Sequence, residues 1–171
     1  MLRSSLTLFP CVCLALIPGP VRAAEPAGAG PCRVAEYQQF DFWLGDWKVY
    51  RDGRLVGYNR VERILNGCAV RESYRTARGF RGTSLSIYDQ STGRWHQTWV
   101  DNEGRLLQLD GQFRDGRMML SGDSREADGS VVNNRITWSV QTDGHVRQLW
   151  EVSRNGGAAW ETAFDGVYRT E

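Results

Sequence analysis

The sequence predicts an all-β fold, an antiparallel up-and-down barrel of about ten strands. Two observations support it. Tight-turn dipeptides recur at short intervals, and the runs between them alternate apolar and polar residues without a helical period of useful length. Sequential hairpins leave two sheet edges exposed, and closing the sheet on itself removes both. A two-sheet sandwich is the alternative, but it requires longer connections than this chain provides.

The first 23 residues have the pattern of a secretory signal peptide. Arg3 supplies a positive charge, residues 6–17 form an apolar run, and small residues precede a cleavage site after Ala23. The apolar run is too short, and too interrupted by proline, to span a bilayer. We therefore expect an exported protein, periplasmic or secreted, that is not held in the membrane after cleavage.

Length and charge limit the classes of function. A chain of 171 residues suits one domain with a substantial core. The signal contains two of the 21 basic residues, so 19 remain against 20 acidic residues in the mature chain. So small a net charge, without a basic run, gives no indication of nucleic-acid binding or of attraction to acidic membranes.

The segment between the signal and the barrel is rich in Pro, Gly and Ala. We expect residues 24–36 to be a flexible linker and residues 37–171 to form the barrel domain. Signal cleavage removes two of the four cysteines and leaves Cys32 and Cys68. In an oxidising compartment such a pair is usually bonded, and the alternative is two unrelated thiols. A disulfide would attach the linker to the second hairpin.

The barrel opens with an apolar cluster, residues 40–44, that precedes Gly45 and Trp47. This stretch resembles the opening of calycin barrels, the lipocalin-like group. The resemblance implies a short helical turn that plugs one end of the barrel, with Trp47 packed over it. With residues 67–68 and 97–101, the sequence is also similar to the bacterial family called domain of unknown function 1579. That similarity covers most of the mature chain and implies a fold without an activity.

The calycin resemblance also has implications for the last strand. In calycins an arginine there commonly lies across the first tryptophan, so Arg169 is expected to close the barrel by stacking on Trp47. Nitrobindin-like barrels, which are similar, hold haem through a histidine near the C-terminus, and residues 159–169 contain none. His96 is expected on the outer face and His145 at a rim. We predict no cofactor and no metal site.

Turn residues define the strands. Most breaks are Asn-Gly or Asp-Gly, which tolerate the positive φ of tight hairpin turns. The longest break, residues 77–82, is expected to form a mobile lip. Gly111, inside the sixth run, indicates a bulge or a corner of the barrel. The predicted strands are 46–51, 54–64, 68–75, 83–88, 94–101, 105–113, 117–121, 131–140, 145–153 and 159–169.

Residues 153–160 resemble the Asp-box, a turn motif, with Asn155 in the place of the aspartate. In sialidase propellers the motif braces a hairpin and has no catalytic role, and a single copy does not make a propeller. The resemblance implies a rigid turn in which Asn155 binds local backbone and Trp160 packs beneath it.

Strand alternation predicts which side chains share the barrel interior. In three strands the more apolar face also carries polar groups. The predicted interior set is Glu72 and Tyr74 of one strand, Gln97 and Trp99 of a second, and Gln148 and Trp150 of a third. An apolar cavity with a few convergent polar groups is typical of small-ligand sites. The alternative is a solid interior in which Glu72 and the two glutamines bind one another.

Glu72 is the single residue that the sequence most strongly suggests for a chemical role. An ionised, unpaired carboxylate inside an aromatic barrel is costly, so either its pKa rises or an arginine pairs with it. A raised carboxyl pKa is also the property of a general acid or base. A structural ion pair is the simpler interpretation.

The favoured function is binding of a small, partly apolar ligand in an aromatic-lined cavity by an exported barrel. The second hypothesis is an enzyme of the isomerase, cyclase or lyase type that uses Glu72 with Tyr74 in the same cavity. The third is a structural or partner-binding module with a solid interior. Neither the ligand nor the oligomeric state follows from the sequence.

Overall fold

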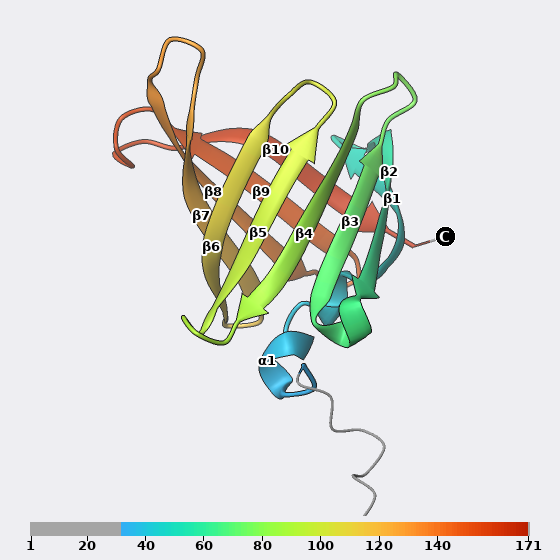
Figure 1. Ribbon diagram of the computed structural model, residues 1–171. Helices are drawn as coiled ribbons and strands as arrows, with labels where there is room; N and C mark the ends of the chain where they lie inside the picture. Colours follow the sequence, from blue (N-terminus) through green and yellow to red (C-terminus); the bar gives the residue numbers. More distant parts are fainter. Residues whose placement is uncertain (1–31, 171) are drawn as a thin grey trace, which may run out of the picture.

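The computed structural model describes residues 32–170, which form a closed antiparallel barrel of ten strands (Figure 1). Each strand pairs with its neighbours in sequence, and β1 pairs with β10 to close the barrel, so the predicted fold is confirmed. The predicted signal peptide lies outside the described residues. The strands are β1 (Gly45–Arg51), β2 (Arg54–Ile64), β3 (Ala69–Arg75), β4 (Arg81–Asp89), β5 (Arg94–Asp101), β6 (Leu106–Arg114), β7 (Arg117–Arg125), β8 (Val131–Val140), β9 (Val146–Ser153) and β10 (Glu161–Arg169).

Three short helical segments complete the fold: α1 (Ala35–Gln38), η1 (Asp41–Trp43) and η2 (Leu65–Gly67). Figure 1 shows α1 beneath one end of the barrel, below the turns that join β2 to β3 and β4 to β5. We call this the plug end. None of these described helices is long and apolar enough to cross a membrane. Because α1 starts at Ala35, the folded domain begins before the predicted boundary at residue 37.

Two strands, β4 and β7, extend beyond their predicted ranges by more than one residue. β7 continues to Arg125 instead of ending at 121, because small and polar residues pair there in regular register with β8. β4 begins at Arg81 and takes in the end of the predicted lip. The remaining turn is closed by a backbone hydrogen bond of 2.9 Å from Thr76 N to Phe80 O.

Gly111 is not at a bulge. It pairs without a register shift with Trp95 of β5 and Leu120 of β7. A Cβ on Gly111 would lie 1.9 Å from the carbonyl oxygen of Met119, so no side chain fits where the two backbones approach. Gly122 of β7 lies equally close to β6. The two glycines therefore allow the backbones of β6 and β7 to approach closely.

The plug end is filled by aromatic side chains. Phe40 and Trp43, both fully buried, stack with ring centroids 4.8 Å apart. The Phe40 ring also makes edge contacts with Trp95 and Trp138. Trp47 of β1 is buried against them and donates a hydrogen bond of 3.0 Å from Nε1 to the carbonyl oxygen of Trp43. The expected plug, with Trp47 packed over it, is therefore present. Burial of each such ring contributes about 1.5–3 kcal/mol to the stability of the fold.

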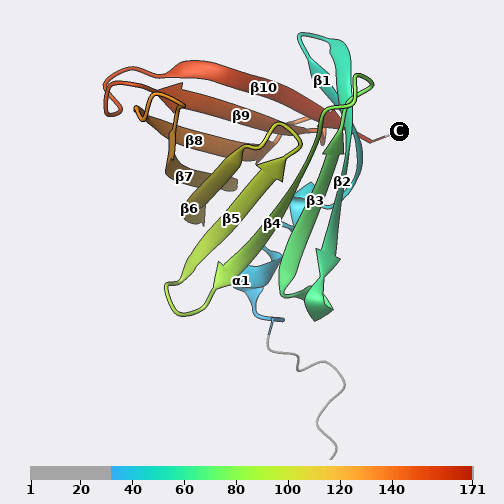
Figure 2. The ribbon, with the colours of Figure 1, turned by 45° about the horizontal axis from the view of Figure 1, so that its top comes forward.

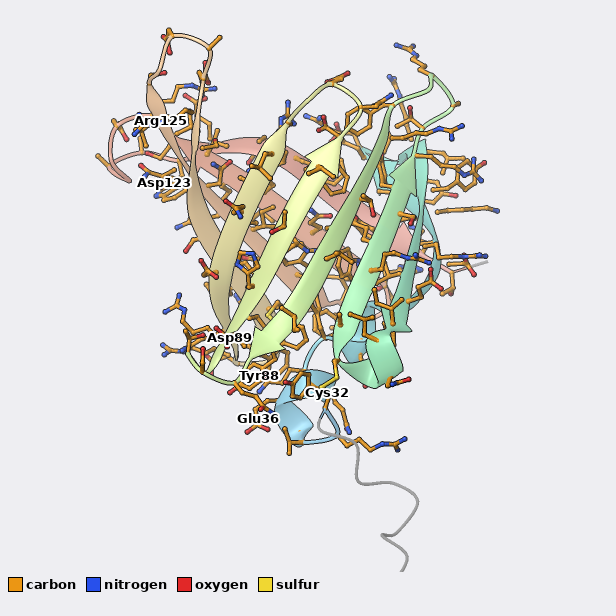
Figure 3. All side chains as sticks on the ribbon, viewed as in Figure 1. Cys32, Glu36, Tyr88, Asp89, Asp123 and Arg125 are labelled. Carbon is orange, nitrogen blue, oxygen red and sulfur yellow. A yellow bond between two sulfur atoms is a disulfide. The ribbon has the colours of Figure 1, made fainter. Side chains whose placement is uncertain are left out.

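The plug is tied to the barrel by covalent and polar links. A disulfide joins Cys32 to Cys68, and Figure 3 shows Cys32 at the plug end. The guanidinium of Arg63 in β2 donates to the carbonyl oxygens of Tyr37, at 2.5 Å, and Gly67, at 2.7 Å. It also pairs with a carboxylate of η1. Because Cys32 is bonded into the fold, the end of the predicted linker is not free.

The expected stacking of Arg169 on Trp47 is wrong. Arg169 pairs in register with Lys48, so both side chains point outward while Trp47 points inward. The Arg169 guanidinium lies over the ring of Tyr50, 4.6 Å from its centroid. Tyr168 makes the interior contact with Trp47 instead. The contact that the calycin resemblance implied for Arg169 is therefore absent from this barrel.

The turn at residues 153–160 has the geometry expected from the Asp-box. The Asn155 Oδ1 atom accepts hydrogen bonds from Ser153 Oγ at 2.8 Å and from Ala159 N at 2.9 Å. Trp160 Nε1 donates to the Gly157 carbonyl oxygen at 3.1 Å. The motif is thus a rigid turn at the end of the barrel opposite the plug.

Candidate ligand-binding cavity

The barrel interior contains a cavity of about 250 Å³. It opens at the end opposite the plug, since its lining includes Thr76 and Phe80 of the β3–β4 turn and Arg105 at the start of β6. Figure 2, turned so that this end comes forward, shows the ring of strands from β1 to β10. All six residues predicted for the interior line this cavity: Glu72, Tyr74, Gln97, Trp99, Gln148 and Trp150.

Glu72 is 5% exposed, and its carboxyl group is held by two neighbouring strands. Asn59 of β2 donates from Nδ2 to Glu72 Oε1 at 2.9 Å, and Ser84 of β4 donates from Oγ to Oε2 at 2.7 Å. No arginine or lysine among the described residues forms an ion pair with it. The interpretation of Glu72 as one partner of a structural ion pair is therefore wrong.

Burial raises the pKa of Glu72 to about 7, although the hydrogen bonds from Ser84 and Asn59 oppose this effect. A carboxyl group with this pKa exists in both protonation states near neutral pH. The cause is desolvation, since two neutral hydrogen-bond donors stabilise a carboxylate less than a cation does.

The two glutamines do not bind Glu72 or each other. Gln97 Nε2 donates to Ser86 Oγ at 3.0 Å, and Gln148 Oε1 accepts a hydrogen bond from the Tyr168 hydroxyl. The carbonyl of Gln97 and the NH₂ group of Gln148 have no partner among the described residues. Because both residues line the cavity, these two groups are available to a bound molecule.

Tyr168 of β10 lies beneath the cavity and is 2% exposed. Burial raises the pKa of its phenol well above the ordinary value, the nearby Glu72 and Tyr74 raise it further, and a hydrogen bond from Asn59 lowers it. The Asn59 side chain thus faces both Glu72 and Tyr168. Its carbonyl oxygen Oδ1 is buried and has no hydrogen-bond partner among residues 32–170. A buried carbonyl without a donor costs free energy in the folded state.

The cavity walls are aromatic rings held in fixed orientations. Trp150 Nε1 donates to Asn134 Oδ1 at 3.0 Å, and Trp99 Nε1 donates to Asp101 Oδ2 at 3.2 Å. The Trp99 ring lies against Gly82, where a Cβ would be 2.0 Å from it. The rings of Tyr74 and Phe164 lie against glycines in the same way. The absence of side chains at these glycines lets the rings lie flat on the barrel wall and leaves the centre open.

The mouth of the cavity is basic. Arg105 is exposed there, with its guanidinium 5.7 Å from the centroid of the Trp150 ring. An adjoining hollow shares Arg105 and Trp150 and extends towards Arg125, which Figure 3 places at the end away from the plug. Arg154 in this hollow is paired with Glu126 at 3.0 Å.

Asn59, Ser84 and Tyr168 were not in the predicted set. On β2 and β4 the inward faces carry Gly, Asn and Ser, so there is no apolar contrast to reveal the alternation. On β10 a register shift between Thr162 and Phe164 breaks the alternation, and both Ala163 and Phe164 line the cavity. Ser84 lies directly opposite Glu72 in the pairing of β3 with β4, so the register of that hairpin is the signal that identifies it.

Neither histidine reaches the cavity. His96 is on the outer face, where its ring contacts Asp110 and Thr98 at 2.8 and 2.9 Å, and His145 contacts Asp143 in the β8–β9 turn. Within residues 32–170 no group of three or more His, Cys, Asp or Glu side chains could hold a metal ion.

Comparison of the chain with protein-family models and with curated proteins gives no match. The assignment of function therefore rests on the geometry of the cavity.

Proposed function

We propose that this protein binds a small, partly apolar molecule inside the barrel. The observation that carries the proposal is the cavity itself, which is lined by the rings of Trp99, Trp150 and Phe164 and by the free amide groups of Gln97 and Gln148. Apolar walls with a few oriented polar groups are typical of ligand sites. A solid interior would leave no such groups without partners.

The dimensions limit the ligand. Ligand cavities usually have volumes of roughly 300–1,000 Å³, so a cavity of about 250 Å³ suits a molecule of one or two rings. The apolar part would stack against the tryptophans, and a polar group would reach Gln97 and Gln148. A negative group at the outer end would be favoured by Arg105.

Export is part of the proposal. The signal-peptide pattern of residues 1–23 and the disulfide between Cys32 and Cys68 both support an oxidising compartment. Membership of the domain of unknown function 1579 family is also part of the proposal, and its support is the resemblance of residues 39–49, 67–68 and 97–101.

The test is to incubate purified mature protein with a metabolite mixture and to identify retained molecules by native mass spectrometry. Bound ligand should quench tryptophan fluorescence through Trp99 or Trp150. Gln148→Leu should weaken binding at least fivefold, the loss of about one hydrogen bond, without unfolding the protein. The outward-facing Gln108→Leu is the matched control. Retention of no small molecule by the folded protein would contradict the proposal.

One observation favours a second function. Glu72 lies in the cavity wall with a pKa of about 7, which suits a general acid or base. In an isomerase or lyase it would move a proton on the bound molecule, with Tyr74 beside it. Glu72→Gln would then abolish turnover of the retained molecule while leaving its binding intact. Turnover unaffected by Glu72→Gln would exclude this role.

A further inference from the structure

The cavity wall presents aromatic ring faces to the interior. The rings of Tyr74, Trp99 and Phe164 line the cavity, and each lies against a glycine of the barrel, where a Cβ would be 2.0–2.4 Å from the nearest ring atom. Backbone therefore covers one face of each ring, and the other face is turned towards the cavity. The faces carry the negative part of the aromatic quadrupole, so they attract cations.

Glu72 adds a carboxylate to this wall. Each of its oxygens accepts one hydrogen bond, at 2.9 Å from Asn59 and at 2.7 Å from Ser84. A carboxylate has about four acceptor positions, so others remain for a bound donor. Glu72 and Trp99 both pair with Ser84, so the register places the carboxylate and the Trp99 ring on either side of one residue of β4.

A second acceptor lies on β5. Gln97 donates its NH₂ group to Ser86 at 3.0 Å, which leaves its carbonyl oxygen for a bound molecule. Ring faces, a carboxylate and a carbonyl all favour a positively charged hydrogen-bond donor. Among residues 32–170 no arginine or lysine supplies one by pairing with Glu72. Arg105 lies at the mouth of the cavity, beside the Trp150 ring.

We propose that the cavity binds a small organic ammonium ion, whose nitrogen donates to Glu72 and Gln97 and lies against the ring faces of Tyr74 and Trp99. This inference rests on the proposed binding function and names the class of ligand. The apolar body of the ligand would extend from this nitrogen towards Trp150.

An ammonium ion would offset the cost of burying the carboxylate. Desolvation raises the pKa of Glu72 to about 7, and a bound cation would lower it again. The other titratable groups that face Glu72 are Tyr74 on its own strand and Tyr168 from β10, and burial raises the pKa of both phenols. The neighbouring strands β2 and β4 present neutral donors, β5 and β9 present neutral amides, and Arg105 is charged at the mouth. Binding below neutral pH should therefore release the proton of Glu72 to water.

The test uses three probes that share a benzyl group. Benzylamine is a cation, benzyl alcohol is neutral and phenylacetate is an anion. Binding of each to purified mature protein is measured by calorimetry at about pH 8, where Glu72 is mostly ionised. Benzylamine should bind about tenfold more tightly than benzyl alcohol, or better, because its hydrogen bond to the carboxylate is charge-assisted. Phenylacetate should bind most weakly.

The pH dependence of benzylamine binding is the second readout. At about pH 5.5 its affinity should be about tenfold lower, or less still, because the cation must then displace a proton from Glu72. Benzylamine stays charged over this range, so the change belongs to the protein. At about pH 6, calorimetry in buffers of different ionisation enthalpy should show release of about one proton per benzylamine bound. The affinity for benzyl alcohol should change much less.

Two variants identify the groups responsible. Glu72→Gln keeps the shape of the side chain and removes its charge, so it should lower the affinity for benzylamine to that for benzyl alcohol and abolish the pH dependence. The outward-facing Glu62→Gln is the matched control and should bind as the wild type does. Arg105→Gln removes the charge at the mouth and should raise the affinity for benzylamine. Melting temperatures show that each variant folds, and the wild-type readouts decide the matter where Glu72→Gln does not.

The outcomes separate the ammonium site from the binding function. Equal affinities for benzylamine and benzyl alcohol at about pH 8, or an affinity for benzylamine unchanged in folded Glu72→Gln, would overturn the ammonium site and leave the binding function standing. Tighter binding of phenylacetate than of benzylamine would show that Arg105 decides the charge of the ligand, and would also overturn it. Binding of none of the probes would contradict the ammonium site, whereas the binding function fails only if the folded protein retains no molecule from the metabolite mixture.

Discussion

A carboxyl group buried without a cation stores an unfavourable free energy that depends on pH. Glu72 illustrates this, because its two partners, Asn59 and Ser84, are neutral and its pKa is raised by desolvation. The folded protein therefore binds a proton more tightly at this position than the unfolded chain does. In a binding protein such a group is kept at a cost to stability, so its presence in the cavity wall points to a use.

Glu72→Gln should remove a pH dependence of stability. The folded pKa is about 7 against 4.5 for the free group. Below the pKa of the free group, Glu72 contributes fully to the free energy of unfolding. This contribution is lost as the pH rises through the folded pKa, and the loss amounts to about 3 kcal/mol. Urea denaturation at about pH 5 and about pH 8 should show this loss in the wild type and its absence in the variant. The outward-facing Glu62→Gln should keep the wild-type slope, and an unchanged slope in Glu72→Gln would place the titration elsewhere.

At the scale of elements, the plug depends on one ring that bridges it to the sheet. Trp47 is 7% exposed and contacts η1 through its hydrogen bond to Trp43. Trp47→Ala should reduce the free energy of unfolding by about 3–5 kcal/mol, measured by chemical denaturation. Tyr50→Ala, which removes an outward-facing ring of the same strand, should cost much less. Equal losses in the two variants would mean that the plug does not stabilise the barrel.

The disulfide should hold the plug in place independently of its packing. Intact-mass measurement with a thiol-blocking reagent should show no labelled cysteine before reduction and two afterwards. Because Cys32 and Cys68 are separated by 36 residues, loss of the bond should cost about 3–4 kcal/mol of stability. Two free thiols in exported, unreduced protein would contradict this.

The sequence predicts the elements better than their contacts. Alternation with a period of two places Glu72, Gln97 and Gln148 inside the barrel, because this period does not depend on which strands are neighbours. The contact of Tyr168 with Gln148 depends on the register between β9 and β10, which the bulge in β10 alters. The contact expected of Arg169 had a different source: it came from the calycin resemblance alone, and the register of β10 against β1 places that side chain on the outer face.

For the molecule as a whole, the weakest pairing is the one that closes the barrel. The pairing of β1 with β10 covers three residue pairs, from Lys48↔Arg169 to Tyr50↔Val167, whereas β7 pairs with β8 over nine. Backbone amides at this seam should exchange with solvent faster than those between β7 and β8, as measured by hydrogen exchange. Ligand should slow the exchange at the seam, since Tyr168 contributes to the cavity. Equally slow exchange at both places would show that the barrel opens as one unit.

The seam also sets the order in which the molecule becomes functional. It joins the first strand of the domain to the last, so it forms by the contact most distant along the chain, which is the slowest kind to form. Until β10 is in place, the barrel is an open sheet of nine strands, Glu72 and Asn59 face no Tyr168, and the cavity has no wall at Phe164. Ligand binding would thus begin with the last event of folding, and an incompletely synthesised or clipped chain could not compete for the ligand.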